Sequence, residues 1–189
     1  MPSRAHTIDA GVRLQNGPVK TIRAALGSIV FLMIAPGVVA GLVPWLLTGW
    51  SVQQPLPFWH LAQAVGIALL VVGTACLLFA FARFVHEGLG TPAPVAPTEH
   101  LVVGGLYRYV RNPMYLAVAG IIVGQALVLG QPILVLYAAA FMLAVWAFVH
   151  WYEEPTLRRR YGDEYEAYRR AVPGWRPRTS PWTGASQSR

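Results

Sequence analysis

Long apolar stretches separated by short polar segments dominate the chain. Four of them approach the length of a membrane-spanning helix: 24–47, 61–82, 114–130 and 133–151. A span needs roughly 20 apolar residues, with a lower limit near ~17, and the third stretch meets only that lower limit. Only residues 130–132 separate the last two, which is a tight turn. The pattern therefore predicts an all-α integral membrane protein with about four transmembrane helices, the last two forming a helical hairpin.

The segment after the fourth stretch has a different pattern. Apolar and aromatic residues recur there every three or four positions, as on one face of a helix. These residues are Leu157, Tyr161, Tyr165, Tyr168 and Val172. Pairs such as Glu166 and Arg170 are spaced for helical ion pairs, Pro155 suits a first helical turn, and Pro173 ends the pattern. We expect a C-terminal amphipathic cytoplasmic helix that lies on the membrane face or folds over the bundle.

The charges give this topology an orientation. The 189 residues are 55% hydrophobic and 12% charged, with a mean hydropathy of +0.45, which is too apolar for an ordinary soluble domain. All 15 Lys and Arg residues lie in the arm 1–23, in the connection 83–113 or after residue 151. A four-helix topology places these segments on one side, and the positive-inside rule makes that side cytoplasmic. We expect an inner (plasma) membrane protein of bacterial type with both termini in the cytoplasm.

The net charge of +7 is explained by this topology, so we expect no nucleic-acid partner. A basic surface for anionic membrane lipids is a further expectation. Cys76 is the only cysteine, so the chain has no cysteine-based zinc site, and we expect no metal. Gly120 and Gly124 are spaced to pack two helices closely or to widen a groove, and close packing is the expectation.

Two polar clusters mark the candidate chemistry. One occupies residues 99–115, before and at the start of the third apolar stretch, and the other occupies residues 152–154, at the end of the fourth. Because the two helices form a hairpin, Arg108, Arg111 and Asn112 must approach Glu153 and Glu154.

The residue types in these clusters suit a zwitterionic ligand. The start of a helix favours an anion such as a carboxylate, and paired glutamates suit an ammonium group or ribose hydroxyls. Several tyrosines suit a flat heterocycle or a cation. An amino acid joined to a nucleoside, such as S-adenosylmethionine, satisfies all three, and a phospholipid headgroup satisfies part. Ordinary interfacial anchoring and helix capping are the alternative readings of the same residues.

The motifs "LVVGGLYRYVRNPMYLA" and, some 35 residues later, "EEPTLRRRYGDEYEAYRRAVPGWRPR" resemble the superfamily of isoprenylcysteine carboxyl methyltransferases and phospholipid methyltransferases. The resemblance covers roughly Thr98 to Arg178. It implies an integral membrane enzyme that uses S-adenosylmethionine and releases S-adenosylhomocysteine. It also implies a cofactor site, to which the basic cluster adds Arg111. With Arg111 included, the candidate cofactor-binding residues are Glu99, His100, Leu101, Val102, Tyr107, Arg111, Asn112, Pro113, Met114, Tyr115, Glu153 and Glu154.

Two positions depart from the family pattern. The family's histidine before the proline is Asn112 here, which keeps hydrogen-bonding capacity but cannot be protonated. The arginine that prenylcysteine enzymes place one turn before the key glutamate is Val149 here, and residues 131–152 contain no Lys or Arg. The second departure argues against a prenylcysteine carboxylate as the substrate.

The expected reaction is methyl transfer to a lipophilic acceptor that enters from the bilayer: a lipid amine, a small hydrophobic thiol or acid, or an isoprenylcysteine-like carboxylate. No catalytic base is assigned, although Glu153 and His150 are conceivable bases. The alternative is a non-catalytic membrane protein that binds a lipid or a partner, which Asn112 favours. A sterol-type reductase lacks support because the chain has no Gly-rich dinucleotide motif.

The chain divides into four expected parts. These are a cytoplasmic arm (1–23), two N-terminal transmembrane helices (24–82), a cofactor-binding methyltransferase core (83–178) and a disordered tail (179–189). The acceptor and the oligomeric state are left open by the sequence.

Overall fold

The computed structural model describes residues 34–55, 57–88 and 101–184, and within these ranges the regular structure is helical. An apolar helix from Ile34 to Thr48 comes first and contains the π-helical turn η1 and helix α3. The elements are η1 (Val38–Leu42), α3 (Val43–Thr48), α4 (His60–Gly88), the 3₁₀ turn η2 (Gly105–Arg108), α5 (Pro113–Leu129), α6 (Ile133–Phe148), the π-helical turn η3 (Val149–Glu153) and α7 (Glu154–Ala171).

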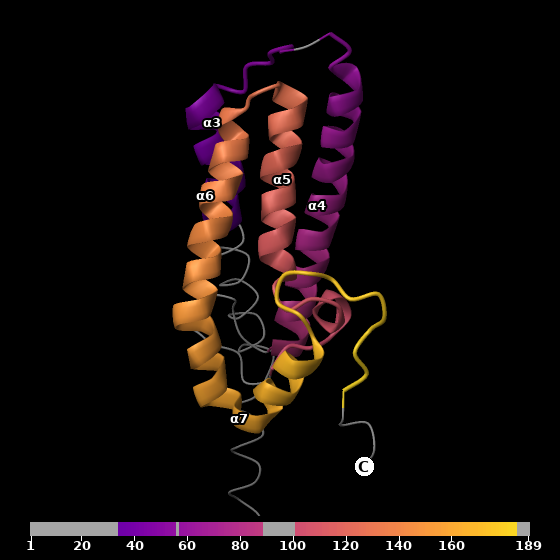
Figure 1. Ribbon diagram of the computed structural model, residues 1–189, viewed down its shortest axis with the longest axis vertical. Helices are drawn as coiled ribbons and strands as arrows, with labels where there is room; N and C mark the ends of the chain where they lie inside the picture. Colours follow the sequence, from indigo (N-terminus) through magenta and orange to yellow (C-terminus); the bar gives the residue numbers. More distant parts are fainter. Residues whose placement is uncertain (1–33, 56, 89–100, 185–189) are drawn as a thin grey trace, which may run out of the picture.

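Helix α5 lies between α4 and α6, and the core forms around it (Figure 1). Its apolar side chains are buried on both flanks, so this helix contributes more to the core than its neighbours do. The buried core residues are Leu77, Ala117, Val118, Ile121, Ile122, Ala126, Leu129, Leu134 and Ala138. The outer faces of α4 and α6 leave large apolar side chains exposed, among them Val71, Leu136 and Leu143. Such faces suit contact with lipid.

The predicted helical membrane fold is confirmed. The 60–83 helix and the helix that starts at Ile133 are long and apolar enough to cross a membrane, while the 34–48 and 113–129 helices are apolar but shorter. The predicted hairpin is present, because α5 ends at Gly130 in a left-handed conformation and α6 starts at Ile133. The arm 1–23 and the part of the first predicted span before residue 34 lie outside the described residues.

The sequence predicted that the fourth span ends at residue 151 and that a separate helix follows. Instead, α6 continues through η3 into α7 without a break. The helix kinks within α7 at Gly162, where φ is 51° and ψ is −125°. Beyond the kink, Tyr165 and Tyr168 are buried against Leu101 and Val103. Of the two predicted placements for the amphipathic helix, the second applies, since α7 folds back over the end of the bundle.

After α7 the chain runs back along the 108–112 segment, and we call residues 172–182 the C-terminal strap. The Arg111 amide donates to the Pro173 carbonyl (2.9 Å), and the Arg178 amide donates to the Tyr109 carbonyl (3.0 Å). The ring of Trp182 packs on Tyr168, with ring centroids 5.3 Å apart. The expectation of a disordered tail from residue 179 is therefore wrong as far as Trp182, while residues 185–189 lie outside the described part of the chain.

Helices α4 and α5 approach most closely at two glycines. A Cβ atom on Gly66 would lie 2.8 Å from the Gly124 carbonyl oxygen, and one on Gly124 would lie 2.9 Å from the Gly66 carbonyl oxygen. A Cβ on Gly120 would meet nothing within 4 Å. The expected close packing thus applies to Gly124, whereas Gly120 borders open space.

We expect Gly124→Ala to destabilise the protein by about 1–3 kcal/mol relative to Gly120→Ala, because the new methyl group overlaps backbone atoms of α4. Both substitutions gain the same helix propensity of about 1 kcal/mol, so their difference isolates the crowding. The measurement is the unfolding midpoint of each variant in mixed micelles titrated with sodium dodecyl sulfate. Equal midpoints would contradict the close helix crossing.

Candidate active site

The candidate site lies where α5 begins and α6 ends. The hairpin predicted that these two points are close, and the distances confirm it. The Tyr115 hydroxyl donates to Glu153 Oε2 (3.1 Å), and Arg111 Nη1 donates to Glu154 Oε1 (2.6 Å). The two glutamates are neighbours in sequence, yet each meets a different residue from the start of α5.

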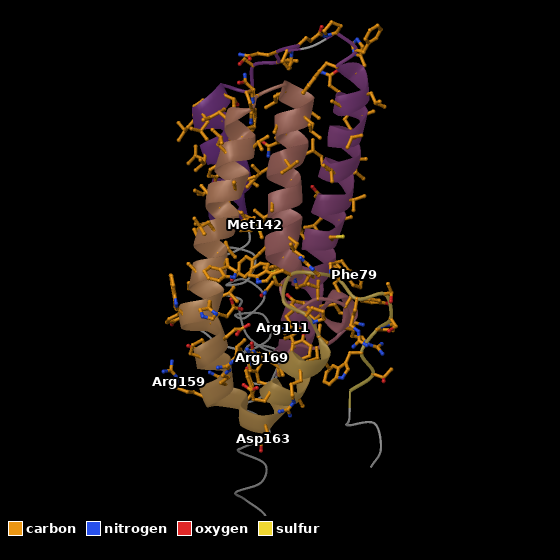
Figure 2. The ribbon with its side chains drawn as sticks, viewed as in Figure 1. Phe79, Arg111, Met142, Arg159, Asp163 and Arg169 are labelled. Carbon is orange, nitrogen blue, oxygen red and sulfur yellow. The ribbon has the colours of Figure 1, made fainter. Side chains whose placement is uncertain are left out.

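Arg111 is the centre of a largely buried network. Besides Glu154, its guanidinium donates to the Tyr165 hydroxyl (2.9 Å) and to the Val172 carbonyl (3.0 Å). The side chains of Arg111 and Glu154 are each 14% exposed. Arg169 Nε lies 3.4 Å from the second oxygen of Glu154, and Figure 2 labels both arginines at the base of the bundle. The charge of Glu154 is therefore met by arginines of the protein itself.

Glu153 lies in a different environment. It is partly buried, and Tyr115 is its hydrogen-bond donor among the described residues. The ion pairs within those residues involve Glu154 and Glu166, not Glu153. Desolvation raises the pKa of Glu153, and the Glu154 charge adds to this, against the lowering effects of Tyr115 and Arg111. Glu153 is thus a carboxylate whose charge the described protein leaves largely uncompensated.

The segment before α5 carries three of the predicted site residues. Leu101 packs on the α7 cluster, and Val102 and Tyr107 are buried against α4. The Tyr107 carbonyl accepts a hydrogen bond from the Tyr168 hydroxyl (2.7 Å), and burial raises the pKa of Tyr168, so this donor stays protonated. Glu99 and His100, also predicted for the site, lie outside the described residues.

The turn that positions Tyr107 depends on Gly105. Its φ is +56°, a conformation that favours glycine. A Cβ atom there would also lie 2.9 Å from Phe79 and 3.0 Å from the Arg83 side chain, both on α4. This glycine is the first residue of the Gly-x-Tyr motif, so the motif has a local structural reason here.

The three residues at the start of α5 have distinct surroundings. Asn112 is buried, and its Nδ2 donates to the Gly174 carbonyl of the strap (3.2 Å). Pro113 opens the helix, and Met114 packs against the buried cluster that contains Val102. Asn112 therefore meets the strap directly in the position where a family histidine was expected.

Sequence reasoning missed the part that the strap plays. In its hydrogen bonds with residues 108–112 the strap contributes backbone groups, so its own side chains show no pattern to detect. His150, a conceivable base, is exposed and stacks on Trp146 with ring centroids 5.4 Å apart. It lies outside the cluster of Tyr115 and Glu153. In the described ranges, no three metal-ligating side chains come together.

We expect Arg111→Gln to destabilise the protein by roughly 3 kcal/mol, because Glu154 and two further acceptors would lose a buried charged donor. The matched control is Arg159→Gln, an exposed arginine bonded only locally to Thr156, which should change stability by less than about 0.5 kcal/mol. Chemical unfolding in detergent measures both. If the two variants are equally stable, the network does not hold the site together.

A family model described as phospholipid methyltransferase matches residues 61–164, which is more than half of the chain. The matched range runs from α4 through the start of α5 to the glutamates at the end of α6. No curated protein and no solved structure matches the chain. The matched range contains the hairpin and both glutamates, and the described fold is helical and apolar enough for a membrane. The chain therefore belongs to the phospholipid methyltransferase family and is an integral membrane protein of methyltransferase type.

Proposed function

We propose that this protein transfers a methyl group from S-adenosylmethionine to a lipophilic acceptor in the membrane. The observation that carries the proposal is Glu153, a partly buried carboxylate at the end of an apolar helix, bonded to Tyr115 and without an ion pair among the described residues. An uncompensated carboxylate in a desolvated place is costly unless a cationic or hydrogen-bonding group meets it. S-adenosylmethionine carries an ammonium group, a sulfonium and ribose hydroxyls, any of which would do so.

The residues around Glu153 fit the rest of this cofactor. The first turn of α5 has backbone N–H groups without helical partners, which favour a carboxylate nearby. Tyr115 lies on that turn, and its ring offers an apolar surface beside the glutamate. Glu154 and Arg111 already neutralise each other, so their role is to hold the two helix ends in place rather than to add charge to the cofactor site.

The protein itself contributes to the reaction by holding the acceptor and the cofactor in position. Glu153 and Tyr115 would hold S-adenosylmethionine, which would offer an activated methyl carbon to the lone pair of the acceptor, with the electrons of the broken carbon–sulfur bond remaining on sulfur. Fixing two reactants in line contributes about 7–11 kcal/mol to such reactions in favourable systems. The Arg111 network fixes the end of α6 relative to α5, and Tyr115 orients the Glu153 carboxylate. No residue is assigned as a catalytic base.

The acceptor most compatible with the chain lacks an ionised carboxylate. Residues 131–152 contain no Lys or Arg that could receive one, and the arginines near the site are engaged by Glu154. A lipid amine or a small hydrophobic thiol needs no such partner. The outward faces of α4 and α6 are apolar, so the acceptor would approach laterally from the bilayer. The distribution of basic residues supports a cytoplasmic location for this end of the bundle.

Glu153→Gln is expected to weaken binding of S-adenosylmethionine and S-adenosylhomocysteine about tenfold or more, because an uncharged amide replaces a charged acceptor of similar shape. Calorimetric titration of the purified full chain in detergent measures the affinities. The matched control is Glu164→Gln, an exposed glutamate on α7, which should bind like wild type. Well-folded wild-type protein that binds neither compound would remove the cofactor assignment and favour a non-catalytic lipid- or partner-binding protein.

Transfer of labelled methyl groups to a panel of acceptors tests which class of acceptor the protein methylates. Among membrane-soluble amines, thiols and carboxylic acids of similar chain length, we expect the acids to be methylated most slowly. The physical reason is that residue 149 is a valine, so no arginine is available there to bind the carboxylate of an acid. Val149→Arg should then raise the relative rate for acids if it folds, and its cofactor affinity serves as the folding control. Fast methylation of acids by the wild-type protein would contradict this substrate preference.

A further inference from the structure

A cavity of about 440 Å³ opens between α4 and α5, beside the start of α5. Ligand pockets in proteins commonly measure about 300–1,000 Å³. Its walls come from both helices, from the turn at residues 106–110 and from Pro177 of the strap. Among the lining residues are Val72, Tyr109, Pro113, Ala117, Gly120 and Pro177. We call this cavity the α4–α5 groove.

The groove and Glu153 lie on different sides of α5. Successive residues of an α-helix are about 100° apart, so Pro113 and Ala117 share a face and Tyr115, between them, points roughly the opposite way. Pro113 and Ala117 line the groove, whereas Tyr115 bonds Glu153. A molecule in the groove would therefore be separated from Glu153 by the body of the helix.

The groove is hollow because of a glycine. A Cβ atom on Gly120 would meet nothing within 4 Å, although Gly124, one turn later, touches α4. The two helices also touch at Gly73, where a Cβ atom would lie 3.1 Å from the Ala117 carbonyl oxygen, so the groove is a hollow beside their contact. Tyr109, Val110 and Pro177 line its end at the 106–110 turn. The side of the groove is open along α4, where Val72 is 58% exposed. An acyl chain in the bilayer can enter there.

Arginines flank the end of the groove at the 106–110 turn. Arg108 precedes Tyr109, Arg176 and Arg178 flank Pro177, and the Arg178 amide bonds the Tyr109 carbonyl. The guanidinium groups of Arg108 and Arg178 donate to the carbonyl oxygens of Trp182 and Ala171, which carry no net charge. The sequence has no Asp or Glu in 101–152 or 167–184. The apolar groove therefore ends at a positively charged rim.

We propose that the α4–α5 groove binds an anionic phospholipid, with an acyl chain in the groove and the phosphate at the rim of Arg108, Arg176 and Arg178. Charge complementarity selects the headgroup, since a cluster of basic residues beside an apolar surface attracts anionic lipid. The apolar lining and the lateral opening favour the acyl chain of a lipid. This lipid is a resident ligand beside the strap and not the methyl acceptor, because α5 separates it from Glu153.

The test uses the purified full chain in a neutral detergent with added phosphatidylglycerol or phosphatidylcholine of the same acyl chains. Native mass spectrometry counts the lipid that each protein retains. Phosphatidylglycerol has no amine, so its retention is independent of any methyl-acceptor site and of the proposed methyl transfer. We expect the wild-type protein to retain phosphatidylglycerol about fivefold or more in preference to phosphatidylcholine, the effect of at least one arginine at a membrane surface.

Two pairs of variants separate the groove from the rim. Gly120→Leu fills the groove and should lower retention of both lipids about fivefold or more, whereas Ala139→Leu, on the exposed face of α6, should not. Arg176→Gln should reduce only the preference for phosphatidylglycerol, whereas Arg159→Gln, on the far side of the bundle in Figure 2, should leave it unchanged. Thermal unfolding in detergent checks that each variant is folded.

Three results would overturn the proposal. One is equal retention of the two lipids by the wild-type protein, which would mean that any bilayer lipid fills the groove. Another is unchanged retention by folded Gly120→Leu, which would place the lipid elsewhere. The third is an equal effect of Arg176→Gln and Arg159→Gln on the preference for phosphatidylglycerol. That result would mean that general surface charge, and not the rim, selects the lipid. If Gly120→Leu does not fold, Gly120→Val provides a smaller filling of the same space.

Discussion

The placement of one guanidinium group constrains the whole end of the bundle at which α5 begins and α6 ends. Arg111 cannot be buried without acceptors for its charge and its N–H groups, and those acceptors come from Glu154, Tyr165 and the Val172 carbonyl. They belong to the start of α7, its far end and the strap. Satisfying Arg111 therefore brings three separate parts of the chain onto the start of α5. It also neutralises Glu154 and leaves its neighbour Glu153 for another partner.

The separation of the two glutamates depends on the helix that carries them. The turn η3 is π-helical, with the Glu154 amide bonded to the Val149 carbonyl five residues earlier. A π-turn inserts one residue and advances the helix surface by about a quarter of a turn or more. Val149, the first residue of η3, is buried, and after the extra residue both Glu153 and Glu154 face inwards, towards Tyr115 and Arg111. A regular helix would turn one of them further towards the surface.

The apolar pattern was sufficient to predict the helices. A long apolar segment in a bilayer must satisfy its backbone hydrogen bonds internally, and a helix does so. The pattern also predicted that Arg111 meets the glutamates, since a three-residue turn brings the two helix ends together. Arg108 and Asn112, predicted to do the same, donate to carbonyl oxygens of the strap instead. The continuity of α6 with α7 was not predictable in this way. A change from an apolar to an amphipathic pattern resembles a boundary, yet Pro155 tolerates an uninterrupted helix at its first turn. The strap was missed because it contributes backbone groups to its hydrogen bonds with residues 108–112, which require no particular side chains in the strap.

Asn112 links the strap to the chemistry of the site. Its amide donates to the Gly174 carbonyl (3.2 Å), and an amide donor does not titrate. A histidine in this position could donate the same bond, but its charge would change near neutral pH. The strap is therefore held in a way that is independent of pH, and residue 112 cannot accept a proton from a methyl acceptor. On the proposed function, an acceptor must then arrive as a competent nucleophile or lose its proton elsewhere. That requirement favours a thiolate, or an amine that burial in the site keeps neutral.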